Sequence, residues 1–292
     1  MLALALVPVL TSLLADDPYL LPIGSKGRVT VSRGQIVQTS SGKAVDLTEV
    51  ARAARSHRFI YIGESHDNAA HHQFQADLIE ALAKDGRRVV VGFEMYTRPA
   101  QETLNPWTLG WWTEEEFIER SDWKKQWGFD FALYRPVFEV VKNHKLPMVA
   151  LNVPREWVRS VGRGGYAALS EEQRKELPTD LHLGNQEHRQ VFQALMGGHP
   201  MTGAQGENVY AAQVLWDEGM ADTALKYLAG RRQDARTAFV VVAGNGHVMY
   251  GQGINYRVHR RTGQRGLTVV QMEPGERREV SRGLADFVVM PR

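Results

Sequence analysis

Two glutamates and two histidines stand at the ends of apolar runs in this chain. Glu64 and His66 lie in a Gly-Glu-Ser-His turn, and His247 closes a Gly-Asn-Gly-His turn that also contains Asn245. Glu94 lies at the end of a third apolar run. Carboxylates and imidazoles ligate divalent metals such as zinc, and they also act as general acids and bases. If these side chains meet, they could hold a metal ion or transfer protons.

The apolar runs before these residues are typical of buried β-strands. Residues 59–62, 89–93 and 238–243 are almost continuously apolar, as strands of a parallel sheet covered on both faces must be. In open α/β sheets, ligands bind outside the carboxyl ends of the strands. We therefore expect the two glutamates and two histidines to meet in one cleft at that edge of the sheet.

Two carboxylates in one buried site require compensation. A buried ionised carboxylate costs several kcal/mol unless it is paired or bound to a metal, and two of them demand a cation or a shared proton. A metal ion held by Glu64, His66, Glu94 and His247 would meet this demand. The structural alternative pairs each glutamate with an arginine, such as Arg98 or Arg155.

Further polar residues could support this site. His71 and His72 fall in the first turn of the helix that follows His66, and His71 shares its face with apolar residues, so we expect it to point inward. Each of these two histidines, taken alone, is more typical of a core or capping residue. Gln213 and Asp217 share one face of a predicted helix over 204–228, because they are four residues apart.

The remaining pattern indicates an α/β protein with a mostly parallel central sheet flanked by helices, because strand and helix patterns alternate. Residues 28–38 alternate like a β-hairpin, and the runs 267–271 and 287–290 are predicted to finish the sheet on an edge. Residues 154–230 carry helical patterns without a convincing strand, which predicts a helical insertion or lid in the second half. We expect residues 16–292 to form a single domain.

The opening residues 1–15 are apolar, too short to span a bilayer as a helix, and end in a small residue. They resemble the apolar region of a signal peptide, although they lack its basic start, so a buried N-terminal segment is the alternative. We expect the protein to be exported, as a periplasmic protein. No later segment approaches transmembrane length.

Composition excludes several classes of protein. The chain of 292 residues has no cysteine, which excludes disulfides, thiolate metal sites and a lipid anchor on an N-terminal cysteine. Its net charge of +2 and scattered basic residues do not favour a nucleic-acid partner. The hydrophobic content of 43% supports a sizeable core.

Five segments, taken together, resemble the ChaN-like haem-binding uptake proteins, which are grouped with the Tiki, TraB and erythromycin-esterase-like proteins. The resemblance runs from about residue 59 to residue 271. The segments are Ile-Gly-Glu-Ser-His-Asp-Asn at 62–68, Phe-Glu-Met at 93–95, Leu-Asn-Val-Pro-Arg at 151–155, Gln-Val-Leu-Trp-Asp-Glu-Gly-Met-Ala at 213–221 and Ala-Gly-Asn-Gly-His at 243–247.

The resemblance implies two functions of different kinds. ChaN-like proteins are described as envelope-associated proteins that bind haem and take part in iron acquisition. Some members of the wider group are metal-dependent hydrolases, and the resemblance makes Glu64, His66, Glu94 and His247 the ancestral site. In a hydrolase, the two histidines and one glutamate would hold a divalent metal such as zinc or manganese, and the other glutamate would be the general base.

A haem-binding protein would need an axial ligand and cationic partners for the propionates. The candidate phenolate ligands are Tyr96, Tyr134, Tyr210 and Tyr250. The candidate propionate partners are Arg98, Arg135 and Arg155. A tryptophan-rich segment could line a haem slot or a homodimer interface, or could pack in the core; its candidate lining residues are Trp107, Trp111 and Trp112.

Overall fold

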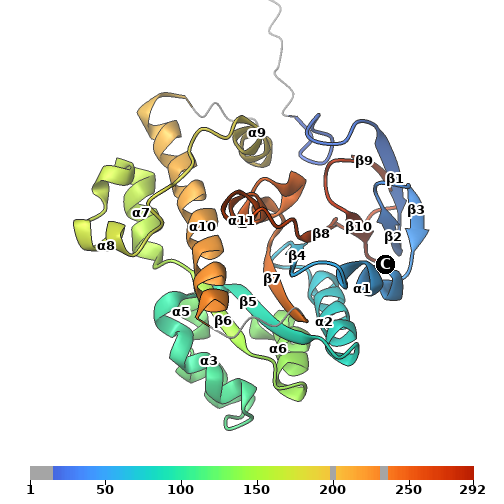
Figure 1. The fold of residues 1–292 in the computed structure, drawn as a ribbon, viewed down its shortest axis with the longest axis horizontal. Coiled ribbons are helices and arrows are strands. Elements are labelled where there is room, and N and C mark those ends of the chain that lie inside the picture. The colour runs from blue at the N-terminus through green and yellow to red at the C-terminus, as the bar shows by residue number, and fades with distance from the viewer. Residues whose placement is uncertain (1–15, 198–201, 231–235) are drawn as a thin grey trace, which may run out of the picture.

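An eight-stranded mixed sheet lies between two layers of helices in the computed structural model (Figure 1). The structure describes residues 16–197, 202–230 and 236–292, so the predicted signal segment at 1–15 lies outside the described residues. The strand order is β3-β2-β10-β8-β4-β7-β5-β6. The six strands from β10 to β6 run parallel to one another, and β2 pairs antiparallel with both β10 and β3. The predicted fold class, a mostly parallel sheet flanked by helices, is confirmed.

The strands are β1 (Arg28–Ser32), β2 (Gln35–Gln38), β3 (Lys43–Val45), β4 (Phe59–Glu64), β5 (Arg88–Thr97), β6 (Met148–Asn152), β7 (Thr237–Gly244), β8 (Leu267–Gln271), β9 (Arg277–Ser281) and β10 (Phe287–Met290). The α-helices are α1 (Leu47–Ala54), α2 (Ala69–Lys84), α3 (Gln101–Thr108), α4 (Glu114–Arg120), α5 (Trp123–Gln126), α6 (Phe131–Asn143), α7 (Arg155–Gly164), α8 (Glu171–Lys175), α9 (Gln186–Leu195), α10 (Gly203–Ala229) and α11 (Ile254–Thr262). Short 3₁₀ turns are η1 (Arg98–Ala100), η2 (Tyr166–Ala168), η3 (Asn245–His247) and η4 (Met249–Gly251).

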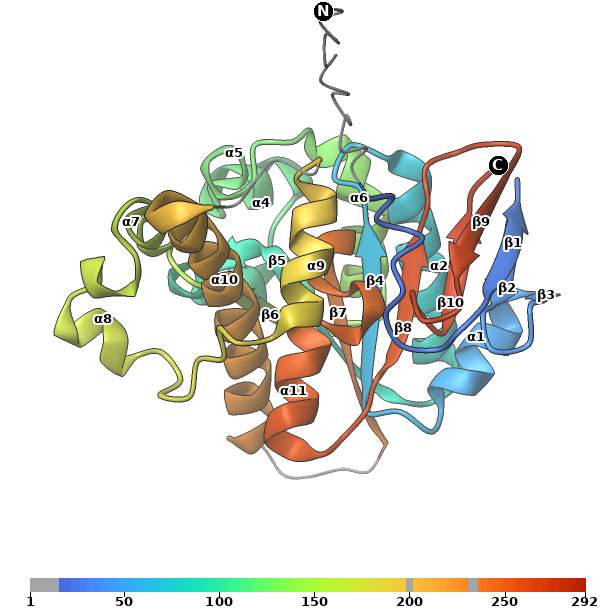
Figure 2. The same cartoon turned by 90° about the horizontal axis from the view of Figure 1, so that it is seen from above.

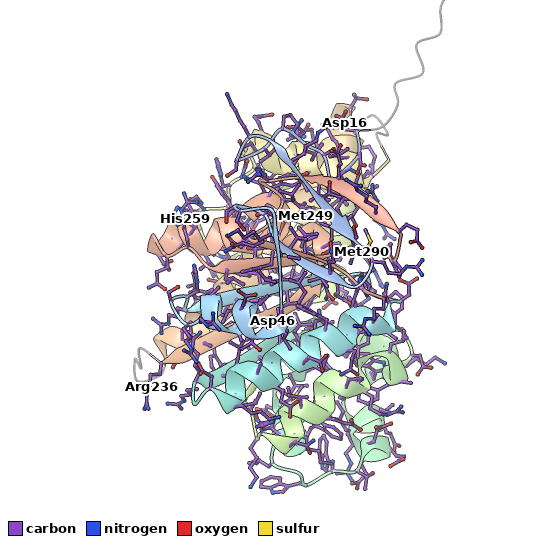
Figure 3. The ribbon with its side chains drawn as sticks, turned by 90° about the vertical axis from the view of Figure 1, so that its right-hand side faces the viewer. Asp16, Asp46, Arg236, Met249, His259 and Met290 are labelled. Atoms are coloured by element: carbon purple, nitrogen blue, oxygen red, sulfur yellow. The ribbon has the colours of Figure 1, made fainter. Side chains whose placement is uncertain are left out.

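Two hydrophobic cores lie on opposite faces of the sheet. Side chains alternate along β4, so that Ile60 and Ile62 join the core under α1, α2 and α6, whereas Phe59 and Tyr61 join the core under α9, α10 and α11. Figure 3 shows α11, with His259 on it, on one side of the strands and α2 on the other. Every residue of β4 and β7 is buried, which explains why these runs lack polar alternation.

The predicted hairpin over 28–38 is wrong. The chain turns at Gly34, whose φ is +73°, but β1 and β2 do not pair with each other. Instead β1 pairs antiparallel with β9 in a separate two-stranded sheet, and β2 pairs with β10 and β3. The late strands β9 and β10 offer full-length partners, so long-range pairing takes precedence over the local turn.

The prediction that 267–271 and 287–290 end the sheet on an edge is also wrong. Strand β8 lies between β4 and β10, and β10 lies between β8 and β2. All residues of both strands are buried. The antiparallel strands β2 and β3 extend the sheet beyond β10, so the edges are β3 and β6.

Residues 154–230 are helical, as predicted, and no strand occurs among those of them that the structure describes. Helix α10 is long and largely buried, and it packs on β6, α7 and α11. It is therefore part of one helix layer, whereas α7 and α8 project to the side of the sheet (Figure 2). Within the described residues, no helix is both long and apolar enough to cross a membrane.

Close packing of the central strands gives a first prediction. A Cβ atom at Gly92 in β5 would lie 2.8 Å from Leu151 Cδ1 and from Phe239 Cε1. We expect Gly92→Ala to lower the free energy of unfolding by about 1–3 kcal/mol, because the overpacked core must shift. Urea denaturation measures this change. The control is Gly162→Ala in α7, whose new Cβ would meet Ala212 at 3.6 Å; an equal loss of stability there would contradict the packing argument.

Candidate functional site

The predicted site residues come from three strands that are neighbours in the sheet. Strand β7 lies between β4 and β5. Glu64 at the end of β4 pairs in register with Gly244 at the end of β7, and Phe93 of β5 pairs with Val242. The turn carrying His247 follows β7 directly. All three carboxyl ends therefore lie at one edge of the sheet.

Glu64 is the centre of a first polar group. Its side chain is fully buried and accepts hydrogen bonds from His66 Nδ1 at 2.7 Å, from the Tyr134 hydroxyl at 3.1 Å and from His72 Nε2. Burial by itself would raise the pKa of Glu64, but the hydrogen bonds and charges of His66 and His72 outweigh it and lower that pKa. Glu64 is thus held as a carboxylate by three donors.

Glu94 and His247 form a second polar group. Glu94 Oε2 accepts a hydrogen bond from the Gly244 amide at 2.7 Å, and its Oε1 lies 3.3 Å from His247 Nε2. On the other side of the ring, His247 Nδ1 donates to Asp217 Oδ1 at 2.6 Å, and the Gln213 amide nitrogen lies 3.1 Å from the same Nδ1. The imidazole is therefore held between two carboxylates.

The charges in this second group decide its protonation. Burial would lower the pKa of His247, but the charges of Glu94 and Asp217 raise it to about 10. Burial would raise the pKa of Glu94, but the His247 charge and hydrogen bond lower it to about 2. The pKa of Asp217 is lowered in the same way by His247 and Arg257, against burial. These shifts favour a protonated His247 held between two ionised carboxylates.

The two groups meet at Gly244. A Cβ atom there would lie 2.8 Å from His66 Cε1 and 3.7 Å from Glu94 Oε2, so the His66 ring lies against Gly244 beside Glu94. The four side chains thus lie close together, but as two hydrogen-bonded pairs. Within the described residues, no group of three or more His, Asp or Glu side chains is arranged to hold a metal ion. The zinc or manganese centre stays a prediction.

His71 and Asn245 fix the turns around this site. His71 is buried; its Nδ1 accepts from the Ser65 amide at 2.9 Å, and its Nε2 lies 2.9 Å from the Met272 carbonyl. The Asn245 side chain donates to the Gln271 carbonyl at 2.6 Å. Both residues bind backbone, so they position Glu64, His66 and His247 without offering ligand atoms themselves.

The structural alternative, in which Arg98 or Arg155 pairs with Glu64 or Glu94, is not observed. Arg98 forms an ion pair with Asp222 at 3.2 Å and donates to Thr223 at 2.7 Å. Arg135 pairs with Glu114 at 2.7 Å. Arg155 donates to the Gln126 carbonyl, and its guanidinium lies 5.7 Å from the centre of the Trp127 ring. Burial lowers the pKa of Arg155, and the charge of Glu94 partly offsets this. Only Arg155 of these three lies near the site, and histidines rather than arginines pair with Glu64 and Glu94.

The four candidate tyrosine ligands are buried phenols rather than open phenolates. Burial raises the pKa of each, to about 12 for Tyr210 and Tyr250 and higher for the other two. Each hydroxyl already lies within hydrogen-bonding distance of another group: Tyr96 of Ser121, Tyr134 of Glu64, Tyr210 of Asn185 and Tyr250 of Pro18. In this arrangement each hydroxyl is already engaged, and a role for any of the four as an axial ligand stays a prediction.

Sequence reasoning missed several members of the site. His188 Nε2 forms an ion pair with Asp217 Oδ2 at 2.9 Å. His72, whose position in the sequence is more typical of a core or capping residue, binds Glu64. The His66 ring contacts Trp127 and Phe129 edge-on, with centroids 4.6 and 5.5 Å apart. The spacing of these residues gives no signal that they belong to a site. The tertiary fold alone brings the segments that carry them to the strand ends.

Exposed apolar side chains lie next to His66 and next to the His247 turn. The His66 side chain is 35% exposed, in contrast to Glu64 at 0%. Phe129 beside it is 36% exposed, and Leu195 and Met196 at the end of α9 are each 41% exposed. A Cβ atom on Gly246 would lie 3.0 Å from Leu195 Cδ1, which places the end of α9 against the His247 turn. We call Phe129, Leu195 and Met196 the apolar rim.

The tryptophan-rich segment is mainly core. Trp107 and Trp123 are only 2% and 3% exposed, and the Trp107 indole donates to the Phe138 carbonyl at 2.9 Å. Of the alternatives left open for this segment, Trp107 follows core packing, because its ring is enclosed by α4 and α6. Trp111 is 71% exposed and is the one member of the segment with a large free surface.

The raised pKa of His247 predicts a pH dependence of stability. Its contribution is fully present below its ordinary value of 6.5 and is lost as pH rises through about 10. We expect the wild type to lose at least about 1 kcal/mol more unfolding free energy between these two pH values than His247→Gln does. Urea denaturation across this range measures the difference. The control His144→Gln, at the end of α6, should retain the wild-type slope; a wild-type slope in His247→Gln would contradict the charge assignment.

Comparisons with known proteins place the chain in a family. Residues 50–258 match the family described as "Haem-binding uptake, Tiki superfamily, ChaN". A solved structure of ChaN from Campylobacter jejuni, described for its cofacial heme binding, has a TM-score of 0.66 at 18% identity, over 87% of this chain and 95% of that one. Its likeness shows the shared fold.

More distant solved structures include the type III effector HopBA1, with a TM-score of 0.47 at 10% identity over 84% of this chain and 93% of that one. An erythromycin esterase mutant in its open conformation has a TM-score of 0.48 at 13% identity, over 84% and 78% of the two chains. No curated protein matches the chain. The match over most of its length shows that this protein belongs to the ChaN family of haem-binding uptake proteins in the Tiki superfamily.

Proposed function

We propose that this protein binds haem at the carboxyl edge of its sheet, beside His66 and the apolar rim, and that it serves iron acquisition. The observation that carries the proposal is the family match over residues 50–258. The rim supports the location, because haem is a largely apolar plane and needs an apolar surface to leave water. His66 supports it because a haem iron needs an axial ligand at such a surface.

His66 fits the role of axial ligand better than the four tyrosines do. Its Nδ1 is held by Glu64 at 2.7 Å, which orients the ring, and Nε2 forms no hydrogen bond within the described residues. A metal-bound imidazole commonly has its second nitrogen held by a carboxylate, because that hydrogen bond fixes the ring and increases its basicity. When bound, the haem would supply the iron centre that His66 ligates.

Arg155 is the proposed partner of a haem propionate. Its guanidinium lies near the Trp127 ring, which in turn contacts His66. Arg98 and Arg135 have ion-pair partners of their own, so they are poorer candidates. A planar guanidinium suits a carboxylate because it can donate two parallel hydrogen bonds.

We further propose that the protein works in the cell envelope, as a periplasmic protein exported by residues 1–15. The apolar, short character of this segment supports export, and the description of the family as uptake proteins supports a role outside the cytoplasm.

A haem with two apolar faces could also be shared by a homodimer, in which a second copy would cover the face turned away from His66.

Haem titration tests the proposal. We expect the wild type to give a saturable, red-shifted Soret band, and His66→Ala to bind haem about tenfold more weakly or to lose the band, because the axial nitrogen is gone. Added imidazole should restore part of the band in His66→Ala. Tyr250→Phe, which removes a candidate phenol remote from His66, should behave like the wild type.

The outcomes separate two claims. A wild type that shows no saturable Soret band would contradict haem binding itself. An unchanged band in His66→Ala, with circular dichroism showing an intact fold, would leave haem binding in place and remove His66 as the ligand. A lost band in Tyr250→Phe would restore that phenol as the candidate.

A further inference from the structure

A cavity lies along the edge strand of the sheet, away from the haem site proposed above. It has a volume of about 720 Å³, within the range of small-molecule binding sites. Its floor is β6, the edge strand, and helices α3 and α10 both pack against that strand (Figure 1). None of Glu64, His66, Glu94 and His247 lines this cavity.

The lining of the cavity combines an apolar floor with cations. Leu109, which is 50% exposed, and the half-buried Pro147 supply apolar surface, whereas Met148, Val149 and Ala150 of the floor are almost fully buried. Arg98, Lys145 and Lys226 supply positive charge, and no aspartate or glutamate is among the described residues that line it. A ligand that fits both features has a hydrocarbon part and a negative charge.

The backbone of the edge strand is already occupied, which decides against a peptide. The Gln101 side chain donates to the Met148 carbonyl at 3.0 Å and accepts from the Ala150 amide at 2.8 Å. The Thr223 hydroxyl donates to the Leu151 carbonyl at 2.9 Å. An added strand needs these same groups for its ladder, so the occupant must bind through its shape and charge instead.

The three cations are not equally neutralised. Arg98 and Lys226 share one carboxylate, Asp222, at 3.2 and 2.8 Å. Lys145 is exposed at the rim of the cavity, and no carboxylate among the residues that the structure describes forms an ion pair with it. The charges of Asp222 and Glu176 both act on Arg98, so the positive charge that stays uncompensated at the mouth of the cavity is that of Lys145.

We propose that this cavity binds a long-chain aliphatic carboxylate, with its chain against Leu109 and Pro147 between α3 and α10 and its carboxylate at Lys145. Burial of the chain supplies the affinity, since apolar contact removes hydrocarbon from water. The lysine supplies the preference for an anion. This site does not depend on the proposed haem function, because it shares no lining residue with the strand ends.

Isothermal titration calorimetry with laurate, below its micelle concentration, tests the proposal on the full chain. We expect one laurate per chain, and no comparable binding of dodecyltrimethylammonium, which has the same chain length and the opposite charge. Lys145→Glu should weaken laurate binding about tenfold, because an attraction becomes a repulsion. The matched control is Lys124→Glu on exposed α5, outside the cavity, which should bind as the wild type does.

A second variant tests the cavity rather than its charge. Asn105 lines the cavity from an exposed position on α3, so Asn105→Trp can fill the space without disturbing the core, and we expect it to abolish laurate binding. Asn143→Trp, exposed at the end of α6 and outside the lining, should leave binding unchanged.

Several results would overturn the proposal. Equal binding of the cationic and anionic amphiphiles would remove the role of Lys145, and retained binding in Asn105→Trp would remove the cavity. Displacement of laurate by haem would show a single shared site. His66→Ala should keep its laurate affinity, so a failure of the haem proposal is distinguishable from a failure of this one.

Discussion

The burial of carboxylates at the strand ends is the constraint on which the rest of the site depends. Glu64 and Glu94 are 2% and 5% exposed, and ionised groups at such depth are costly unless donors surround them. Histidines meet this requirement at both places, through His66 and His72 for Glu64 and through His247 for Glu94. The turns after β4 and β7 must therefore deliver imidazoles to fixed positions.

The same requirement ties a helix layer to the sheet. Asp217 of α10 binds His247, and His247 binds Glu94 of β5, so one chain of charges joins the helix to two strands. Close packing also holds α10 in place. A Cβ atom on Gly219 of α10 would lie 2.3 Å from Val153 Cγ1, so only glycine allows α10 to come this close to Val153. Helix α10 is thus anchored by charge and by shape, which explains why it is a layer of the fold rather than a loose lid.

Much of this fold could be predicted from sequence, and the exceptions have physical causes. Continuous apolar runs identify β4, β5 and β7, because strands buried on both faces admit few polar residues. The N-terminal strands were misplaced because alternation predicts a strand but not its partner, and β1 and β2 pair with strands about 250 residues later. His188 and Phe129 reach the site from segments with no distinguishing pattern. The four candidate tyrosine ligands could not be ranked from sequence, because residue type does not show whether a hydroxyl is already hydrogen-bonded.

The two groups at the strand ends differ in what a ligand could disturb. His247 is bonded through both ring nitrogens and is 7% exposed, so binding through it would break an ion pair at each side. His66 uses one nitrogen, and Glu64 keeps the Tyr134 and His72 contacts whatever happens at Nε2. A ligand at His66 would therefore leave the buried charges paired. In the proposed function this asymmetry makes His66 the point where a ligand can bind without loss of the fold, whereas His247 links β5 to α10.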